Sequence, residues 1–188
     1  MISVLLPSKQ EPKVLEVMMI LEEMIPDVQI IIANDRYGMG KGWAMREALS
    51  QAQYDVVCFL DADMDIHPKM IWRLMPFLDD YDIVVGKKQV RGFLSRRILT
   101  RLSRLYIWIL FGLGFDTQTG IKLFKRDAIM PWLSNSFAFD IEILSNAKKA
   151  GFDIIEVPVE TSTTKRMNIK SILKCLIESF KIKLREFV

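Results

Sequence analysis

The chain has 188 residues, a length that predicts one domain with a core large enough for independent folding. Hydrophobic residues make up 51% of it, but no apolar run reaches the roughly 18 residues of a membrane-spanning helix, which argues against a membrane-spanning protein. The net charge of +3 identifies no class of partner, and two isolated cysteines argue against a disulfide framework or zinc site and for a cytosolic setting.

The first part of the chain alternates between strand-like and helical patterns. Residues 2–6 and 29–33 predict buried strands, and residues 14–24 between them predict a helix. A glycine-rich segment at 38–42 precedes a second helical pattern at 43–52. This order indicates βαβ units and a parallel sheet. Because the chain begins with a strand-like run, we expect no signal peptide.

The glycine-rich segment has two possible interpretations. Its backbone can approach a phosphate closely, and Lys41 supplies a positive charge for that phosphate. The alternative is a tight turn before a helix, since the segment matches neither a Walker loop nor a dinucleotide-binding fingerprint. The segment alone does not decide between the two.

An apolar strand-like run, residues 56–60, ends at three carboxylates spaced two apart: Asp61, Asp63 and Asp65. Ligand sites in open α/β sheets lie beyond the carboxyl ends of such strands, and carboxylates there can hold Mg²⁺ or a similar hard cation. The alternative is a solvated loop that caps the helix opening near Pro68.

The second part of the chain continues the alternation of helices and strands. We expect helices at 70–78, 94–113, 137–150 and 168–187, and strands at 82–86, within 116–125, and at 153–159. The helices at 94–113 and 168–187 combine basic residues with apolar stripes, which suits either an interfacial helix on anionic lipid or a helix covering the sheet. Nucleic acid is disfavoured, because no recognisable binding motif accompanies the basic residues.

Several segments together resemble the inverting glycosyltransferases of the GT-A fold, family 2. These segments are ISVLLPSKQEP, GKGWAMREAL, FLDADMDIHP, DTQTGIKLFKRDA, and FAFDIEIL followed by IIEVPV. Within the family, the chain looks most like enzymes that glycosylate polyprenyl phosphates, such as dolichyl-phosphate glucose or mannose synthases. The resemblance implies an α/β fold with a Rossmann-like, mostly parallel sheet and helices on both faces.

The resemblance also implies a donor site for a UDP- or GDP-sugar with Mg²⁺ or Mn²⁺. The residues implied to line the nucleoside and nucleotide site are Pro7, Glu11, Asp35 and Lys41. Asp61 would contact the nucleotide or its metal, Asp63 would ligate the metal, and Asp65 stands where a third ligand often sits.

On the acceptor side, the resemblance implies that Arg91, Ser95 and Arg97 handle an acceptor phosphate, because arginine matches phosphate geometry. Asp140 and Glu142 match acidic positions near the acceptor and would orient it. A phosphate is already an anionic nucleophile, so we expect in-line displacement with inversion. The residues expected to carry catalysis are Asp63, Arg91, Asp140 and Glu142.

The predicted function is a metal-dependent transfer of sugar from a nucleotide-sugar to a polyprenyl phosphate, by one domain spanning residues 1–188 that lies peripherally on the cytoplasmic membrane face. One alternative is a soluble family 2 glycosyltransferase with a small-molecule or protein acceptor. Another is a non-catalytic sugar-nucleotide binder. A nucleotidyltransferase is disfavoured because PSKQEPK lacks the glycine-rich loop that such enzymes carry after the first strand.

Overall fold

The computed structural model describes residues 1–8, 12–88, 94–162 and 169–185, with the backbone alone at 94–99 and 169–172. The strands are β1 (Ser3–Ser8), β2 (Gln29–Asn34), β3 (Val56–Leu60), β4 (Ile83–Lys88), β5 (Ile121–Lys125) and β6 (Ile154–Val159). The helices are α1 (Val14–Met24), α2 (Lys41–Leu49), α3 (Met70–Leu74), α4 (Leu94–Phe111), α5 (Phe139–Lys149) and α6 (Ile169–Arg185), with short 3₁₀ turns at Met75–Leu78 and Arg126–Ala128.

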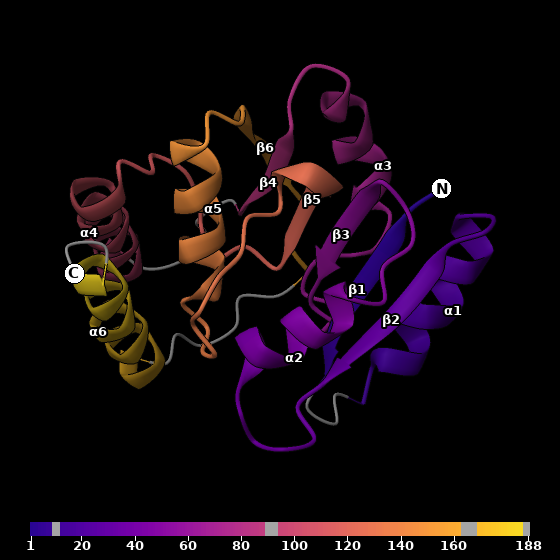
Figure 1. Ribbon diagram of the computed structural model, residues 1–188, viewed down its shortest axis with the longest axis horizontal. Coiled ribbons are helices and arrows are strands. Elements are labelled where there is room, and N and C mark those ends of the chain that lie inside the picture. The colour runs from indigo at the N-terminus through magenta and orange to yellow at the C-terminus, as the bar shows by residue number, and fades with distance from the viewer. Residues whose placement is uncertain (9–11, 89–93, 163–168, 186–188) are drawn as a thin grey trace.

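The described strands form one sheet in the order β2-β1-β3-β5-β4-β6 (Figure 1). β1 pairs in parallel with β2 and β3, and β4 pairs in parallel with β6. β5 runs antiparallel to both of its neighbours, β3 and β4. The sheet is therefore mostly parallel, as expected, with one reversed strand near its centre.

Helices cover both faces of the sheet, and each face has its own apolar core. On one face, α1 and α3 pack on side chains such as Leu6, Cys58 and Leu123. On the other, α2 and α5 pack on Phe59 and Phe124. The alternation follows from strand geometry, because successive side chains of a strand point to opposite faces. The expected α/β fold with helices on both faces is confirmed.

Among the predicted boundaries that differ from the structure, two lie at prolines. β1 continues through Pro7, where β1 no longer pairs with β3, whose register with it ends at Leu5. A proline is tolerated where a strand has an unpaired side. The helix expected at 70–78 changes to a 3₁₀ turn at Met75, because Pro76 cannot donate the next backbone hydrogen bond.

α4 and α6 lie side by side at the edge of the molecule farthest from β2 (Figure 1). The Tyr106 hydroxyl on α4 donates a hydrogen bond to the Leu176 carbonyl on α6, at 3.0 Å. Across the described part of the chain, no helix combines the length and apolar character needed to cross a bilayer.

Candidate active site

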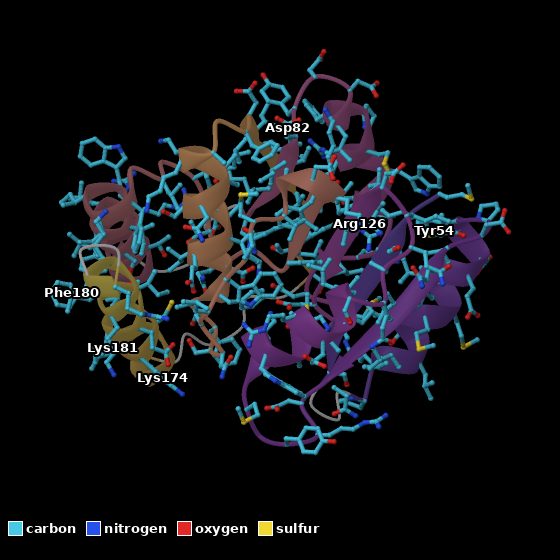
Figure 2. The ribbon with its side chains drawn as sticks, in the orientation of Figure 1. Tyr54, Asp82, Arg126, Lys174, Phe180 and Lys181 are labelled. Atoms are coloured by element: carbon cyan, nitrogen blue, oxygen red, sulfur yellow. The ribbon has the colours of Figure 1, made fainter. Side chains whose placement is uncertain are left out.

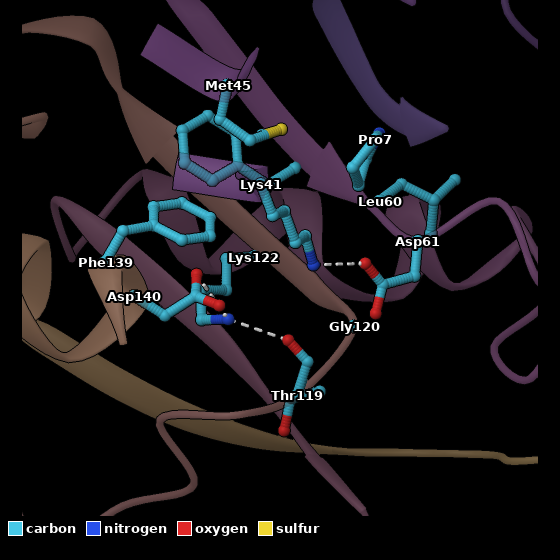
Figure 3. Close-up of a pocket in the computed structure, with 11 residues that line it drawn as sticks. Pro7, Lys41, Met45, Leu60, Asp61, Thr119, Gly120, Lys122, Phe139 and Asp140 are labelled. Atoms are coloured by element: carbon cyan, nitrogen blue, oxygen red, sulfur yellow. Dashed lines mark hydrogen bonds and ion pairs between the residues drawn. The ribbon is translucent and has the colours of Figure 1, made fainter. Parts of the chain in front are cut away.

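A cavity opens where β1 and β3 end. Its walls come from five elements distant in sequence, and the residues that line it are Pro7, Lys41, Met45, Phe59, Leu60, Asp61, Thr119, Gly120, Lys122, Phe139 and Asp140 (Figure 3). The cavity contains two lysine–aspartate pairs. Its position agrees with the general rule that open α/β sheets bind ligands beyond the carboxyl ends of their strands.

The first pair joins Lys41, the first residue of α2, to Asp61, the residue after β3. The Lys41 Nζ atom lies 2.7 Å from Asp61 Oδ1 (Figure 3). Burial lowers the pKa of Lys41, but the charges of Asp61 and Asp140 outweigh burial and leave the pKa above its ordinary value. Burial raises the pKa of Asp61, but the charge and hydrogen bond of Lys41, together with the charges of Lys122 and Lys88, outweigh burial, so the net shift is downward. Both groups are therefore charged at neutral pH.

The second pair joins Lys122 on β5 to Asp140 on α5. Lys122 Nζ lies 3.0 Å from Asp140 Oδ1, and the two side chains are 3% and 9% exposed. The Lys122 ammonium also donates a hydrogen bond to the Thr119 carbonyl at 2.7 Å. Burial raises the pKa of Asp140, and the charges of Lys122 and Lys41 only partly oppose this effect. The sequence reasoning missed Lys122, although a lysine within the apolar run of β5 was the available signal.

Close packing around Gly120 shapes the Asp61 end of the cavity. A methyl group built on Gly120 would stand 2.7 Å from Asp61 Oδ2, so a larger residue would displace the carboxylate. The Asp61 amide donates to the Gly120 carbonyl at 2.8 Å, which fixes the backbone at the same point. The residue before β5 thus holds the residue that follows β3.

Asp63 and Asp65 do not line this cavity. Asp63 Oδ1 accepts a hydrogen bond from the Asp65 amide at 2.9 Å, and Asp65 Oδ2 lies 2.8 Å from Lys88 Nζ. Among the described residues, no group of three or more His, Cys, Asp or Glu side chains is arranged to hold a metal ion. The structure therefore brings Asp61, and neither Asp63 nor Asp65, to the cavity wall.

Asp35 shapes the glycine-rich loop before α2. Its two carboxylate oxygens accept hydrogen bonds from the amides of Met39, at 2.7 Å, and Gly40, at 2.9 Å. Gly40 has a positive φ of 111°, which favours glycine. Asp35 thus positions the segment from which Lys41 extends into the cavity, while Asp35 itself is not among the lining residues.

Glu142 faces a loop and not the cavity, in contrast to Asp140. Its buried carboxylate accepts hydrogen bonds from the amides of Leu133, at 3.1 Å, and Ser134, at 2.8 Å. The same loop contacts the glycine-rich segment, since the Gly42 amide donates to the Asn135 carbonyl at 2.8 Å. The Glu142 carboxylate thus supports the loop. The sequence predicted that Glu142 lies at the cavity, but in the structure Glu142 is not among the lining residues.

Four of the predicted site residues cannot be placed. Glu11 and Arg91 lie outside the described residues, and Ser95 and Arg97 lie in α4 where only the backbone is described. Pro7, Lys41, Asp61 and Asp140 are the predicted site residues that the structure brings together around one cavity.

The chain is similar in sequence to a known protein family and to individual curated proteins. A sequence model of the family described as "Glycosyl transferase family 2" matches residues 19–129, more than half of the chain. An undecaprenyl-phosphate mannosyltransferase of Micrococcus luteus is 25% identical over 148 residues, which span 71% of this chain and 60% of the relative. A dolichyl-phosphate beta-glucosyltransferase of Trichomonas vaginalis is 27% identical over 179 residues, 81% of this chain and 53% of the relative. The chain therefore spans little more than half the length of these curated relatives.

Solved structures share the fold over nearly the whole chain. Glucosyl-3-phosphoglycerate synthase from Mycobacterium tuberculosis, in complex with UDP, superposes with a TM-score of 0.74 at 16% identity, covering 98% of this chain and 79% of that one. Mannosyl-3-phosphoglycerate synthase from Rubrobacter xylanophilus gives a TM-score of 0.72 at 18% identity, covering 98% of this chain and 74% of that one. At these identities the likeness concerns the fold.

Proposed function

Because the chain belongs to glycosyl transferase family 2 and has the GT-A fold, we propose that it transfers a sugar from a nucleotide-sugar to a polyprenyl phosphate at a membrane surface. The observation that carries the proposal is the cavity beyond β3, where Asp61 and Lys41 stand opposite the buried Asp140–Lys122 pair. The names of the curated relatives, which refer to undecaprenyl and dolichyl phosphates, support the acceptor class.

We assign the donor to the side of the cavity formed by Pro7, Lys41 and Asp61. A lysine at the start of a helix suits a diphosphate, since both the ammonium and the helix N-terminus favour negative charge. Crystal structures of the M. tuberculosis synthase contain UDP-glucose and Mn²⁺, which supports a nucleotide-sugar donor. Among the residues that shape this side, Asp35 acts through the glycine-rich loop, and Glu11 is kept as a predicted contact of the nucleoside.

The residues present fit a divalent cation of the Mg²⁺ or Mn²⁺ type. Magnesium is usually bound by one or two protein carboxylates, with substrate phosphates and water completing its octahedron, so a cluster of three carboxylates is not required. We propose Asp61, in the cavity wall, and Asp63, whose charge acts on Lys41 although it does not line the wall, as the ligands, while Asp65 is paired with Lys88. The cation, when bound, stabilises the negative charge that grows on the departing nucleoside diphosphate.

The transfer itself requires that an acceptor oxygen attack the anomeric carbon opposite the leaving group, with inversion. A phosphate acceptor is anionic at neutral pH and needs orientation, which we assign to Arg91, Ser95 and Arg97. Lys41 neutralises charge on the diphosphate side, and Asp140 orients the reacting sugar at the far wall of the cavity. Glu142 contributes by holding the loop that supports the glycine-rich segment.

Membrane contact is assigned to one face of α4 and α6. Apolar side chains about half exposed or more form a stripe on each helix: Leu102, Leu105, Trp108 and Ile109 on α4, and Leu173, Ile177, Phe180 and Leu184 on α6. Lys174 and Lys181 flank the second stripe (Figure 2). Aromatic and aliphatic side chains next to lysines suit an interface with anionic headgroups, which would place the protein peripherally on the cytoplasmic face.

The proposed transfer is tested with the full chain, Mn²⁺, and radiolabelled UDP-glucose or GDP-mannose, with undecaprenyl phosphate in vesicles as acceptor. We expect labelled lipid from the wild type, none after EDTA treatment, and none from Asp61→Asn or Asp63→Ala. Asp80→Asn, a change of an exposed aspartate, is the matched control and keeps activity. Full activity of Asp61→Asn, or transfer in EDTA, contradicts the proposal.

Membrane attachment is tested separately by flotation with vesicles that contain anionic phospholipid. We expect the wild type to float with anionic vesicles, to float less at high salt, and to remain in solution when Trp108 and Phe180 are both changed to serine. If the wild type does not float but transfers sugar to a water-soluble phosphate, the soluble glycosyltransferase is the better description.

A further inference from the structure

Lys122 occupies a position where an ionised lysine is costly. It lies on β5 in the middle of the sheet, in register with Phe59 of β3 on one side and Val85 of β4 on the other, both buried. Removing an ammonium from water costs several kcal/mol unless it is paired and hydrogen-bonded. Replacing such a pair with packed apolar side chains is often neutral or stabilising, so stability alone does not account for Lys122.

The partners of Lys122 lie at the cavity. Its ammonium contacts Asp140 Oδ1 at 3.0 Å and the Thr119 carbonyl at 2.7 Å, and all three residues line the cavity wall (Figure 3). The lysine therefore fixes the carboxylate of α5 relative to the loop before β5. With Lys41 and Asp61 on the opposite wall, the cavity lining contains two lysines and two aspartates.

The Asp140 carboxylate supplies hydrogen-bond acceptors at this end of the cavity, because it lines the wall and is paired there with Lys122. Hydroxyl groups can donate hydrogen bonds to a carboxylate. This end of the cavity therefore suits the hydroxyl groups of a bound molecule.

We propose that Lys122 is a positioning residue that holds the Asp140 carboxylate in place, so that Asp140 binds hydroxyl groups of the transferred sugar. This inference rests on the proposed function, since it divides the cavity between a diphosphate end at Lys41 and Asp61 and a sugar end at Lys122 and Asp140. Lys122 acts through Asp140. Loss of the Lys122 side chain therefore weakens binding of the sugar and leaves binding of the nucleoside diphosphate unchanged.

The test compares binding of UDP-glucose with UDP, and of GDP-mannose with GDP, by calorimetry in Mn²⁺. We expect Lys122→Met to weaken binding of the sugar nucleotide about 10- to 100-fold, the range for losing a hydrogen bond to a charged group. Binding of the free nucleoside diphosphate should change less than about 3-fold. Lys125→Met, on the same strand but with an exposed lysine paired to Asp82, is the matched control and should match the wild type.

The double variant Lys122→Met/Asp140→Asn is the control for misfolding. Lys122→Met alone leaves Asp140 buried without its lysine partner, whereas the double variant replaces both members of the pair. We expect the double variant to bind the nucleoside diphosphate as the wild type does, but to bind the sugar nucleotide no more tightly than the nucleoside diphosphate. We also expect its kcat to be no lower than that of Asp140→Asn alone. If Lys122→Met binds and turns over the sugar nucleotide as Lys125→Met does, Lys122 has no such role. If the wild type binds no sugar nucleotide at all, the proposed function fails and this inference fails with it.

Discussion

Changing Glu142 to glutamine should destabilise the fold. The carboxylate accepts two backbone hydrogen bonds inside the protein, from Leu133 and Ser134. The amide keeps one accepting oxygen and turns its NH₂ group toward the second backbone N–H, so one charge-assisted bond is lost. Such a bond contributes about 1.5–3 kcal/mol to the free energy of unfolding. In a protein of this size, the loss lowers Tm by about 3–12 °C.

The measurement is urea denaturation followed by circular dichroism, with thermal melting as a second readout. Glu160→Gln is the matched control, because Glu160 is 67% exposed and, within the part of the chain that the structure describes, its ion pair is with exposed Lys69, at 3.3 Å. An exposed ion pair contributes less than about 1 kcal/mol, so the control should melt within a few degrees of the wild type.

Activity measured on the same Glu142 variant separates two roles. A supporting role predicts lower stability with residual transfer at temperatures where the variant is folded. If Glu142→Gln melts like the wild type but loses transfer at saturating substrate, the carboxylate acts on the substrate and its contact with the loop is incidental.

Two further changes probe the glycine-rich segment. Lys41→Gln should tighten Mn²⁺ binding to the nucleotide-free protein several-fold, because the ammonium at 2.7 Å competes with the cation for Asp61; titration followed by electron paramagnetic resonance measures this, and unchanged affinity contradicts the competition. Gly42→Ala should lower stability by about 1–3 kcal/mol, because its methyl group would overlap the Ser134 carbonyl. Gly114→Ala, where space is open, is the control in the same melting assay, and equal melting temperatures would show that the loop simply moves aside.

The strands were readable from sequence, but their order was not. β1 and β3 are short apolar runs, which a sheet covered on both faces requires. The insertion of β5 between β3 and β4 in the reverse direction depends on contacts among distant segments, and no local pattern encodes it. The importance of Lys122 was hidden for the same reason, because it depends on which strands flank β5.

The site was predicted in part, and helix and turn geometry explain the rest. Residues two apart on a helix point about 200° apart, so Asp140 and Glu142 could not both face the cavity. Asp61, Asp63 and Asp65 would share a face only in an extended strand, but the chain turns there, with Met64 at a positive φ of 59°. The carboxylates therefore diverge to separate partners.

The residues that line the cavity are spread along the sequence, from Pro7 near the start of the chain to Asp140 on α5. A nascent chain that has emerged only as far as β4 already holds Asp61 and Lys41, yet it lacks Lys122 and Asp140, which complete the enclosure. The complete cavity is therefore not available to a ligand during the early steps of folding. If nucleotide-sugar is the ligand, as proposed, it favours the folded protein over its unfolded forms only once α5 has left the ribosome.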